Sequence, residues 1–180
     1  MCLFTGKGAV FNSRGKDMTD FVKQVLKLLG ENARYSFAEM ADILGASEQD
    51  VKKAVKELEE TKTVVKYAAI LNTEVLPEKN VQALIEVIVA PQKLKGFESC
   101  AEEIYNFPEV QSLYLMSGGF DLAVFVEGKD IGAIAKFVAE KLSVLDGIVG
   151  VATHFILKKY KIEGQITKPE PAHKREIIQA

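Results

Sequence analysis

The sequence predicts an α+β protein with a winged helix-turn-helix domain followed by a ferredoxin-like domain of βαββαβ order. Between residues 19 and 66, apolar residues recur at three- and four-residue spacing, which indicates amphipathic helices. From residue 81 onward, short β-branched stretches alternate with two further helical segments, which indicates a sheet with helices packed on it. A chain of 180 residues is long enough to bury two small cores.

Composition limits the partners of such a protein. The hydrophobic content of 48% favours a globular chain, and a net charge of -2 means that an anionic partner must bind to a local basic patch. Two cysteines and two histidines form no cluster with the spacing of metal ligands, so we expect no metal and no cofactor. The longest apolar run, residues 83–90, is much shorter than the roughly 20 residues that span a bilayer. We expect a cytoplasmic protein.

Residues 1–18 contain glycines and scattered charges but no sustained periodicity. The segment also lacks the apolar stretch of a secretory signal. We expect a disordered extension here, with a translation start at Met18 or a functional arm as alternatives.

Three helices are predicted between residues 19 and 60. Thr19, Ser36 and Ser47 are residues of the type that caps a helix N-terminus, and Gly45 can adopt the left-handed conformation that ends one. The small side chain of Ala41 suits the close contact at a tight turn between helices. The faces expected to pack together are Val22, Val25, Leu26 and Leu29; Phe37, Met40, Ala41 and Leu44; and Val51, Val55 and Leu58.

The outer face of the third predicted helix carries Gln49, Lys52, Lys53 and Lys56. In a DNA-binding helix-turn-helix this face enters the major groove, where glutamine reaches base edges and lysine reaches phosphates or guanine. The alternative is an ordinary solvated face, which is favoured by the nearby acids Glu57, Glu59 and Glu60. On these residues alone the two interpretations stay balanced.

The second domain is expected to follow an extended connector or strand over residues 63–72 and a linker over residues 67–80. Its strands are predicted at residues 81–90, 110–116, 121–126 and 149–158, and its helices at residues 97–105 and 131–142. We expect both helices to cover one sheet face and a dimer partner to cover the other. Leu113, Leu115, Val124 and Val126 are expected on that second face. The domain should end near residue 161, and residues 162–180 should form a flexible tail.

The segment "SGGFD", residues 117–121, joins the two middle strands. Gly118 and Gly119 can take positive backbone torsions and leave N–H groups open to a carboxylate, while Asp121 can accept a hydrogen bond from an ammonium group. The alternative is an ordinary hairpin turn that Asp121 caps. Without other information the turn is the favoured interpretation.

Taken together, "NARYSFAEMADILGASEQDV", "YAAILN" and "SGGFDLAVFV" resemble the leucine-responsive regulator/AsnC (feast/famine) family over roughly residues 19–160. The resemblance implies a DNA-binding domain, a ligand domain, strand-mediated dimers that often form octamers, and an amino-acid effector bound between subunits near the glycine hairpin. It assigns DNA contact to Ser47, Gln49, Lys52, Lys53 and Lys56, and effector contact to Ser117, Gly118, Gly119 and Asp121.

The chain departs from the family pattern at a few positions. Ala54 stands where many members have an arginine, Glu57 stands where a base is common, and Lys62 and Lys66 replace glycines near the wing. Loss of cations weakens anchoring to phosphates, although Lys62 and Lys66 can partly restore it. The sequence therefore predicts a DNA-binding transcriptional regulator that responds to an amino acid or related metabolite.

Two alternatives to this function remain open. One is an effector-binding oligomer without DNA contact. The other is a sirohaem decarboxylase-like enzyme, which would need an axial ligand such as His154. The sequence contains no nucleophile with an assignable base and no phosphate-binding loop, so we expect no enzyme.

Overall fold

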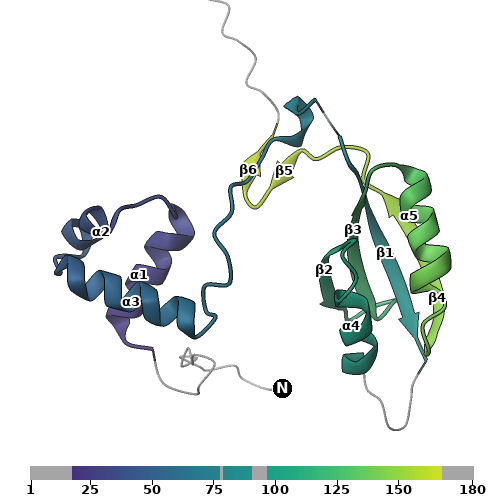
Figure 1. Cartoon of the computed structure of the whole chain (residues 1–180), viewed down its shortest axis with the longest axis horizontal. Coiled ribbons are helices and arrows are strands. Elements are labelled where there is room, and N and C mark those ends of the chain that lie inside the picture. Colours follow the sequence, from purple (N-terminus) through teal and green to yellow (C-terminus); the bar gives the residue numbers. More distant parts are fainter. Residues whose placement is uncertain (1–17, 78, 91–96, 168–180) are drawn as a thin grey trace, which may run out of the picture. The chain divides into compact units, whose positions relative to one another are not determined.

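The computed structural model describes residues 18–77, 79–90 and 97–167. The chain divides between Ala69 and Ile70 into two compact units (Figure 1). The N-terminal unit is helical, and the C-terminal unit combines helices with a four-stranded sheet. The α+β fold class and the order of its two parts are as the sequence predicts.

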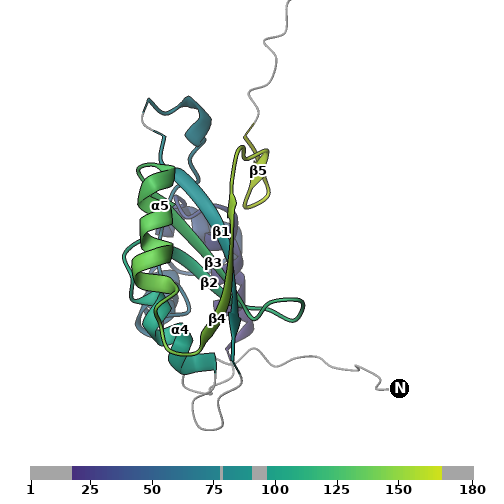
Figure 2. The same cartoon turned by 90° about the vertical axis from the view of Figure 1, so that its right-hand side faces the viewer.

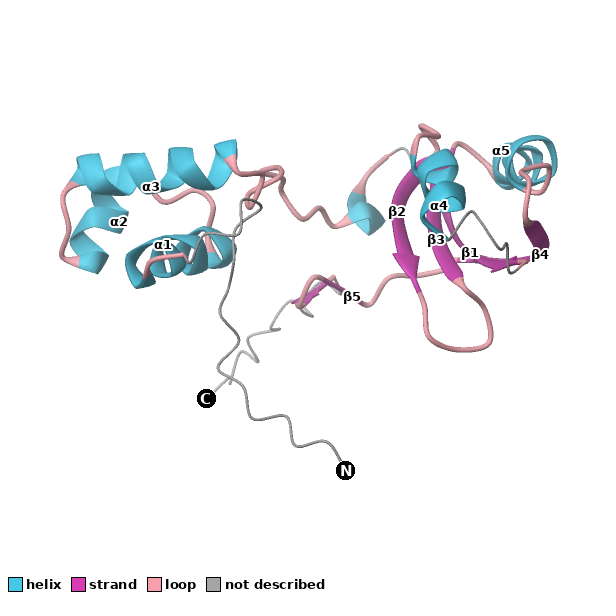
Figure 3. Cartoon of the chain, turned by 90° about the horizontal axis from the view of Figure 1, so that it is seen from below, coloured by secondary structure: helices cyan, strands magenta, loops and turns pink. Residues whose placement is uncertain are grey.

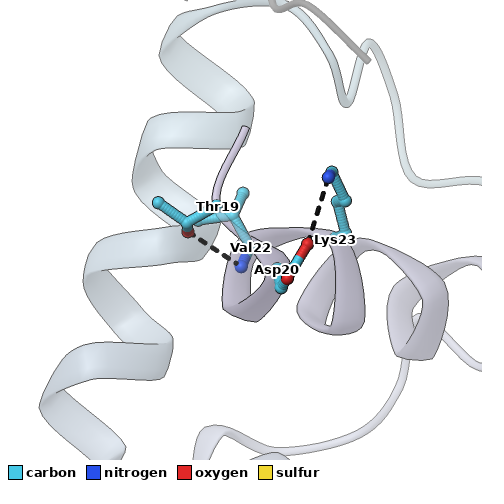
Figure 4. Close-up of polar contacts among 4 residues, drawn as sticks. All are labelled: Thr19, Asp20, Val22 and Lys23. Atoms are coloured by element: carbon cyan, nitrogen blue, oxygen red, sulfur yellow. Dashed lines mark hydrogen bonds and ion pairs between the residues drawn. The ribbon is translucent and has the colours of Figure 1, made fainter. Parts of the chain in front are cut away.

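Three capped helices form the N-terminal unit: α1 (Asp20–Glu31), α2 (Phe37–Leu44) and α3 (Glu48–Glu60). At the start of α1, the Oγ1 atom of Thr19 accepts a hydrogen bond of 3.4 Å from the backbone N–H of Val22 (Figure 4). Lys23 Nζ lies 3.1 Å from Asp20 Oδ1, and Figure 4 also draws this ion pair. The predicted caps at Thr19, Ser36 and Ser47 are all confirmed.

Local interactions fix both ends of α2. α2 begins with a capping box, in which the Glu39 carboxylate accepts a hydrogen bond of 2.7 Å from the Ser36 backbone N–H. This hydrogen bond makes the largest contribution to lowering the pKa of Glu39, and the hydrogen bond from the Ser36 hydroxyl lowers it further. α2 ends at Gly45, whose φ of 61° lies in the left-handed region that glycine adopts at low cost.

The core of the N-terminal unit lies between its three helices. Val25 and Val51 are fully buried, and Ala54 on α3, which the sequence analysis did not place inside, is only 4% exposed. Met18 packs in the same core, so the expected disordered extension does not include this residue. Residues 1–17 lie outside the described part of the chain.

A turn follows α3 in place of a wing's strands. Lys62 adopts a φ of 57°, where a residue other than glycine is strained by about 1 kcal/mol. The Tyr67 hydroxyl donates a hydrogen bond of 3.0 Å to Glu59 Oε1, which holds the start of the linker near the end of α3. Residues 63–72 form a connector rather than a strand, and the short 3-10 helix η1 (Thr73–Val75) follows.

The C-terminal unit contains the antiparallel sheet, with strands in the order β2-β3-β1-β4. Its elements are β1 (Val81–Val89), α4 (Phe97–Tyr105), β2 (Val110–Leu115), β3 (Leu122–Gly128), α5 (Ile131–Phe137), a π-helical turn η2 (Val138–Leu142) and β4 (Ile148–Phe155). The predicted βαββαβ order is confirmed. Both helices lie on the same face of the sheet (Figures 2 and 3).

The face of the sheet beneath α4 and α5 holds the core of this unit. The register pairs Ile85 with Val124 and Ala83 with Val126, so Val124 and Val126 are buried beneath the helices, 0% and 2% exposed. Leu113 packs against the same core. The prediction that Leu113, Leu115, Val124 and Val126 line the uncovered face is therefore wrong. β3 reads LAVFV and is apolar at both parities, so alternation did not identify its inner face.

The opposite sheet face is not covered by a helix of the described chain. Tyr114 and Phe125 meet there with ring centroids 5.9 Å apart, and Ile88 and Tyr114 are 44% and 54% exposed. The strand residues on this face, which we call the uncovered face, are Gln82, Leu84, Glu86, Ile88, Ser112, Tyr114, Ala123, Phe125, Glu127, Gly150, Ala152 and His154.

After β4 the chain forms a short hairpin, β5 (Lys161–Ile162) and β6 (Gln165–Ile166). The prediction of a flexible tail that begins at residue 162 is therefore wrong for the residues of this hairpin. Thr167 is buried, its hydroxyl donates a hydrogen bond to the backbone carbonyl of Lys159, and its own carbonyl accepts one of 2.8 Å from the Asn72 side chain. The hairpin is thereby tied to the linker.

Candidate functional site

The exposed side of α3 is the first candidate binding surface. The helix buries Val51, Ala54, Val55 and Leu58 on one side. Gln49, Lys52, Lys53 and Lys56 are all exposed on the other. One amide and three ammonium groups on a single helix face are donors that suit base-edge acceptors and phosphate oxygens.

Acidic residues on α3 moderate this positive face. Lys56 Nζ lies 3.7 Å from Glu60 Oε1, but both side chains are more than half exposed and such a pair contributes little to stability. Lys53 stands beside Asp50 and Glu57 at the rim of an open cavity of about 470 Å³. Lys52 has no ion-pair partner among the described residues, so it is the least compensated cation of the face.

Ser47 differs from the other four predicted DNA-contacting residues. Its Oγ atom accepts a hydrogen bond of 3.1 Å from the Asp50 backbone N–H and lies 2.6 Å from Asp50 Oδ2, to which it donates. The hydroxyl therefore fixes the start of α3, whereas the other four side chains do not hold the helix in place.

The loop between β2 and β3 is the second candidate site. It projects from the sheet on the side away from α4 and α5 (Figure 2). Met116 N–H donates to Asp121 O at 2.8 Å, and Asp121 N–H donates to Val87 O at 3.0 Å, so both ends of the loop are closed. Within the described chain, the exposed residues Ser117, Gly118 and Gly119 use none of their backbone N–H groups in a hydrogen bond.

The glycines of this loop do not have the backbone conformation that the sequence suggested. Positive φ values occur at other glycines, Gly45, Gly147 and Gly164, but not at Gly118 or Gly119. A Cβ atom added at either loop position would meet no heavy atom within 4 Å. Neither torsion nor packing within the chain requires glycine here, so the space beside both residues is open to an outside molecule.

Asp121 has a structural role, but it is not the capping of the hairpin turn that the sequence left as an alternative. Its Oδ2 atom accepts a hydrogen bond of 2.8 Å from the Val89 backbone N–H and so joins the start of β3 to the end of β1. Its other carboxylate oxygen has no hydrogen-bond partner in the described chain. No sequence signal identified Val89, because this partner lies 32 residues away and contributes only its backbone.

His154 lies on the uncovered face of the sheet, with Nε2 3.4 Å from Glu86 Oε1. The two side chains are 56% and 34% exposed. Among the described residues, no three histidine, cysteine or acidic side chains are grouped as a metal site. No helix in the described part of the chain has the length and apolarity needed to cross a membrane.

Comparison with known proteins decides the family. The Lrp/AsnC ligand-binding domain model matches residues 82–166, and the winged helix-turn-helix DNA-binding model matches residues 18–64. YugG of Bacillus subtilis (strain 168), named an uncharacterized HTH-type transcriptional regulator, is 38% identical over 89% of this chain and 98% of its own length. The chain belongs to the Lrp/AsnC family. It is a DNA-binding transcriptional regulator with a ligand-binding domain.

Other relatives and structures agree with the assignment to the Lrp/AsnC family. The HTH-type transcriptional regulator LrpA of Pyrococcus abyssi is 35% identical over 77% of this chain and 96% of its own. AsnC of E. coli shares the fold with a TM-score of 0.63 at 20% identity, covering 85% of this chain and 100% of that one. A Neisseria meningitidis regulator solved as an L-Met complex has a TM-score of 0.63 at 27% identity, covering 81% and 93%.

Proposed function

We propose that this Lrp/AsnC protein contacts double-stranded DNA through the exposed face of α3 and responds to an amino acid or related metabolite at the β2–β3 loop. The protein acts in the cytoplasm as a homo-oligomer, either a dimer or an octamer that contains four such dimers. The observation that carries the proposal is the division of α3 into a buried apolar side and an exposed cationic side. Such a division leaves one face of the helix available to a groove of DNA.

Each residue of the α3 face has a distinct part in the proposed contact. Gln49 reads base edges, while Lys52, Lys53 and Lys56 contact phosphates or guanine. Ser47 positions the first turn of the helix against the DNA backbone, because its hydroxyl fixes where α3 begins. The positively charged face then supplies affinity that falls as salt rises.

At the β2–β3 loop, the proposed effector presents its carboxylate to the open N–H groups of Ser117, Gly118 and Gly119. Asp121 receives the ammonium group with the carboxylate oxygen that Val89 does not use. Charge-assisted hydrogen bonds of this kind are about twice as strong as neutral ones. The L-Met complex of the Neisseria relative supports an amino acid as the effector class.

The uncovered sheet face is the proposed dimer interface. Leu84, Ile88, Tyr114 and Phe125 give it an apolar surface, and two copies that pair there would remove this surface from water. The effector loop projects on the same side of the sheet (Figure 2), so an effector bound at the loop lies where two copies meet.

The DNA contact is tested with a charge reversal on α3 and a matched reversal elsewhere. Lys52→Glu/Lys56→Glu should flatten the dependence of log affinity on log salt by about two units, one for each lost phosphate contact. Lys27→Glu/Lys136→Glu is the control, because each of these exposed lysines, like Lys56, faces an acid four residues along its helix, at 3.8 Å in both cases. Fluorescence anisotropy with fragments selected from genomic DNA measures both variants. Equal salt slopes for the two variants would show that the exposed face of α3 does not contact DNA.

The effector-binding oligomer without DNA contact is the second candidate function. The pairing of Lys56 with Glu60, and Ala54 in place of a family arginine, favour it. Failure of the wild-type protein to enrich any genomic fragment would select this candidate. We propose no enzymatic activity, because the named relatives are regulators.

A further inference from the structure

A cavity of about 380 Å³ lies at the end of the sheet opposite the β2–β3 loop. It is formed by the linker at Thr73 and Leu76, the start of β1 at Val81, and the chain that leaves β4 at Phe155. Figures 1 and 2 show the linker entering β1 at the same end of the sheet at which β4 exits toward β5. The cavity therefore belongs wholly to the C-terminal unit.

The lining of this cavity combines an apolar wall with three lysines. Leu76, Ile131 and Phe155 contribute apolar surface, and Lys79, Lys158 and Lys159 contribute ammonium groups. Lys158 Nζ lies 5.2 Å from the centre of the Tyr160 ring, which attracts the charge without neutralising it. Neither Lys158 nor Lys159 forms an ion pair with a described carboxylate.

Glu127 also lines the cavity, but its carboxylate is already engaged. Asn80 Nδ2 donates to Glu127 Oε1 and Gln82 Nε2 donates to Glu127 Oε2, each at 2.6 Å. These neutral amides do not remove the negative charge of Glu127, but the lining holds three ammonium groups against this one carboxylate. The excess of positive charge favours a carboxylate over the ammonium group of an amino acid.

We propose that this cavity binds a small carboxylate with an apolar body and no ammonium group, the class to which branched 2-oxo acids belong. Lys158 and Lys159 bind the carboxylate, and the wall of Leu76, Ile131 and Phe155 packs against the apolar body. The site is separate from the amino-acid site proposed at the β2–β3 loop, which lies at the other end of β1.

Binding in this cavity has a direct route to the linker. Thr73 and Leu76 are linker residues, and Asn72 beside them holds the carbonyl of Thr167. A ligand packed on Leu76 therefore contacts the segment that leads to the N-terminal unit. The ligand changes the affinity for DNA only if it binds one conformation of the linker more tightly than another.

Calorimetric titration of the full-length protein with 4-methyl-2-oxopentanoate tests the site without any need for DNA. The wild-type protein should bind this probe, and Lys158→Gln/Lys159→Gln should lower the affinity at least tenfold. Leu76→Trp should also block binding by filling the cavity, and Leu76 is exposed enough, at 39%, for the chain to fold with the larger ring. The uncharged 4-methylpentan-2-one should bind much more weakly.

Two further variants distinguish this site from others. Lys27→Gln/Lys136→Gln removes the same charge elsewhere, and Asp121→Asn alters the β2–β3 loop, so both should bind the probe as the wild type does. No binding by wild type, or equal binding by Lys158→Gln/Lys159→Gln, would overturn the proposal. Loss of binding in Asp121→Asn alone would assign the probe to the loop and overturn it as well.

Discussion

The exposed face of α3 and the β2–β3 loop differ in how their candidate functional residues serve the fold. On α3, the side chains of Gln49, Lys52 and Lys53 form no hydrogen bond or ion pair within the described chain. In the loop, Asp121 closes the sheet through the Val89 backbone N–H while it is also the proposed contact for an ammonium group. Apart from the cap residue Ser47, the candidate residues of α3 are thus separate from those that stabilise the helix, whereas in the loop one residue has both roles.

Backbone hydrogen bonding explains this difference. A helix satisfies most of its backbone groups internally, so its outward side chains are released from structural roles. A strand that ends beside a loop leaves backbone groups unpaired, and a side chain such as Asp121 must satisfy them. The helix face should therefore tolerate substitution better than the loop.

The largest expected effect is a loss of stability in the N-terminal unit alone. Leu58→Ala removes a side chain that is 1% exposed, and such substitutions lower the free energy of unfolding by about 2–5 kcal/mol. Hydrogen exchange should speed up in α1 and α3 while protection in β1 is retained. Lys52→Ala on the opposite side of α3 is the control, and it should change neither the free energy of unfolding nor the hydrogen exchange of α1 and α3. Equal loss of protection in β1 would mean that the units unfold together.

The double role of Asp121 can be divided by two substitutions. Asp121→Asn keeps an oxygen for Val89 but loses a charge-assisted contact worth roughly 1.5–3 kcal/mol, so effector affinity should fall about tenfold or more. Asp121→Ala also loses the acceptor, so the free energy of unfolding should fall by about 1–3 kcal/mol as well. Calorimetry with a panel of amino acids and thermal unfolding measure the two quantities. Equal effector binding by wild type and Asp121→Asn would leave Asp121 with only its structural role.

A substitution at the loop glycines should uncouple binding from folding in the loop itself. Because neither has a positive φ and both have open space, Gly118→Ala/Gly119→Ala should change the free energy of unfolding by no more than about 1 kcal/mol. The added methyl groups should nevertheless lower effector affinity in the same calorimetric assay. Gly45→Ala, at a φ of 61°, is the contrasting control and should destabilise the protein. Unchanged effector affinity would show that the effector does not approach these residues.

The smallest expected effect concerns Lys62. Lys62→Gly should raise the stability by up to about 1 kcal/mol, because it removes a side chain from a strained left-handed position. If Lys62 contacts a phosphate, the same change should flatten the salt slope of DNA binding by about one unit. Lys66→Gly lacks the strain and should not stabilise the protein. A less stable Lys62→Gly would show that this lysine makes a stabilising contact in solution.

Interactions between residues close together in the chain were predictable from the sequence, and interactions between distant segments were not. The caps at Thr19, Ser36 and Ser47 were predictable because each cap and its partner lie three residues apart. The bond from Val89 to Asp121 and that from Asn72 to Thr167 were not, since they join distant segments. The inner face of β3 required the strand register, because both parities of the strand are apolar.

The central position of β1 has a consequence for synthesis of the protein on the ribosome. The contacts of α1, α2 and α3 are local, so this unit can fold soon after it emerges. β1 lies between β3 and β4, and its second neighbour is complete only at Phe155. At a translation rate of roughly 5–20 residues per second, the edge of β1 that pairs with β4 keeps its backbone N–H and C=O groups unpaired for several seconds. During this interval a chaperone or a neighbouring nascent chain can bind to the incomplete ligand-binding domain.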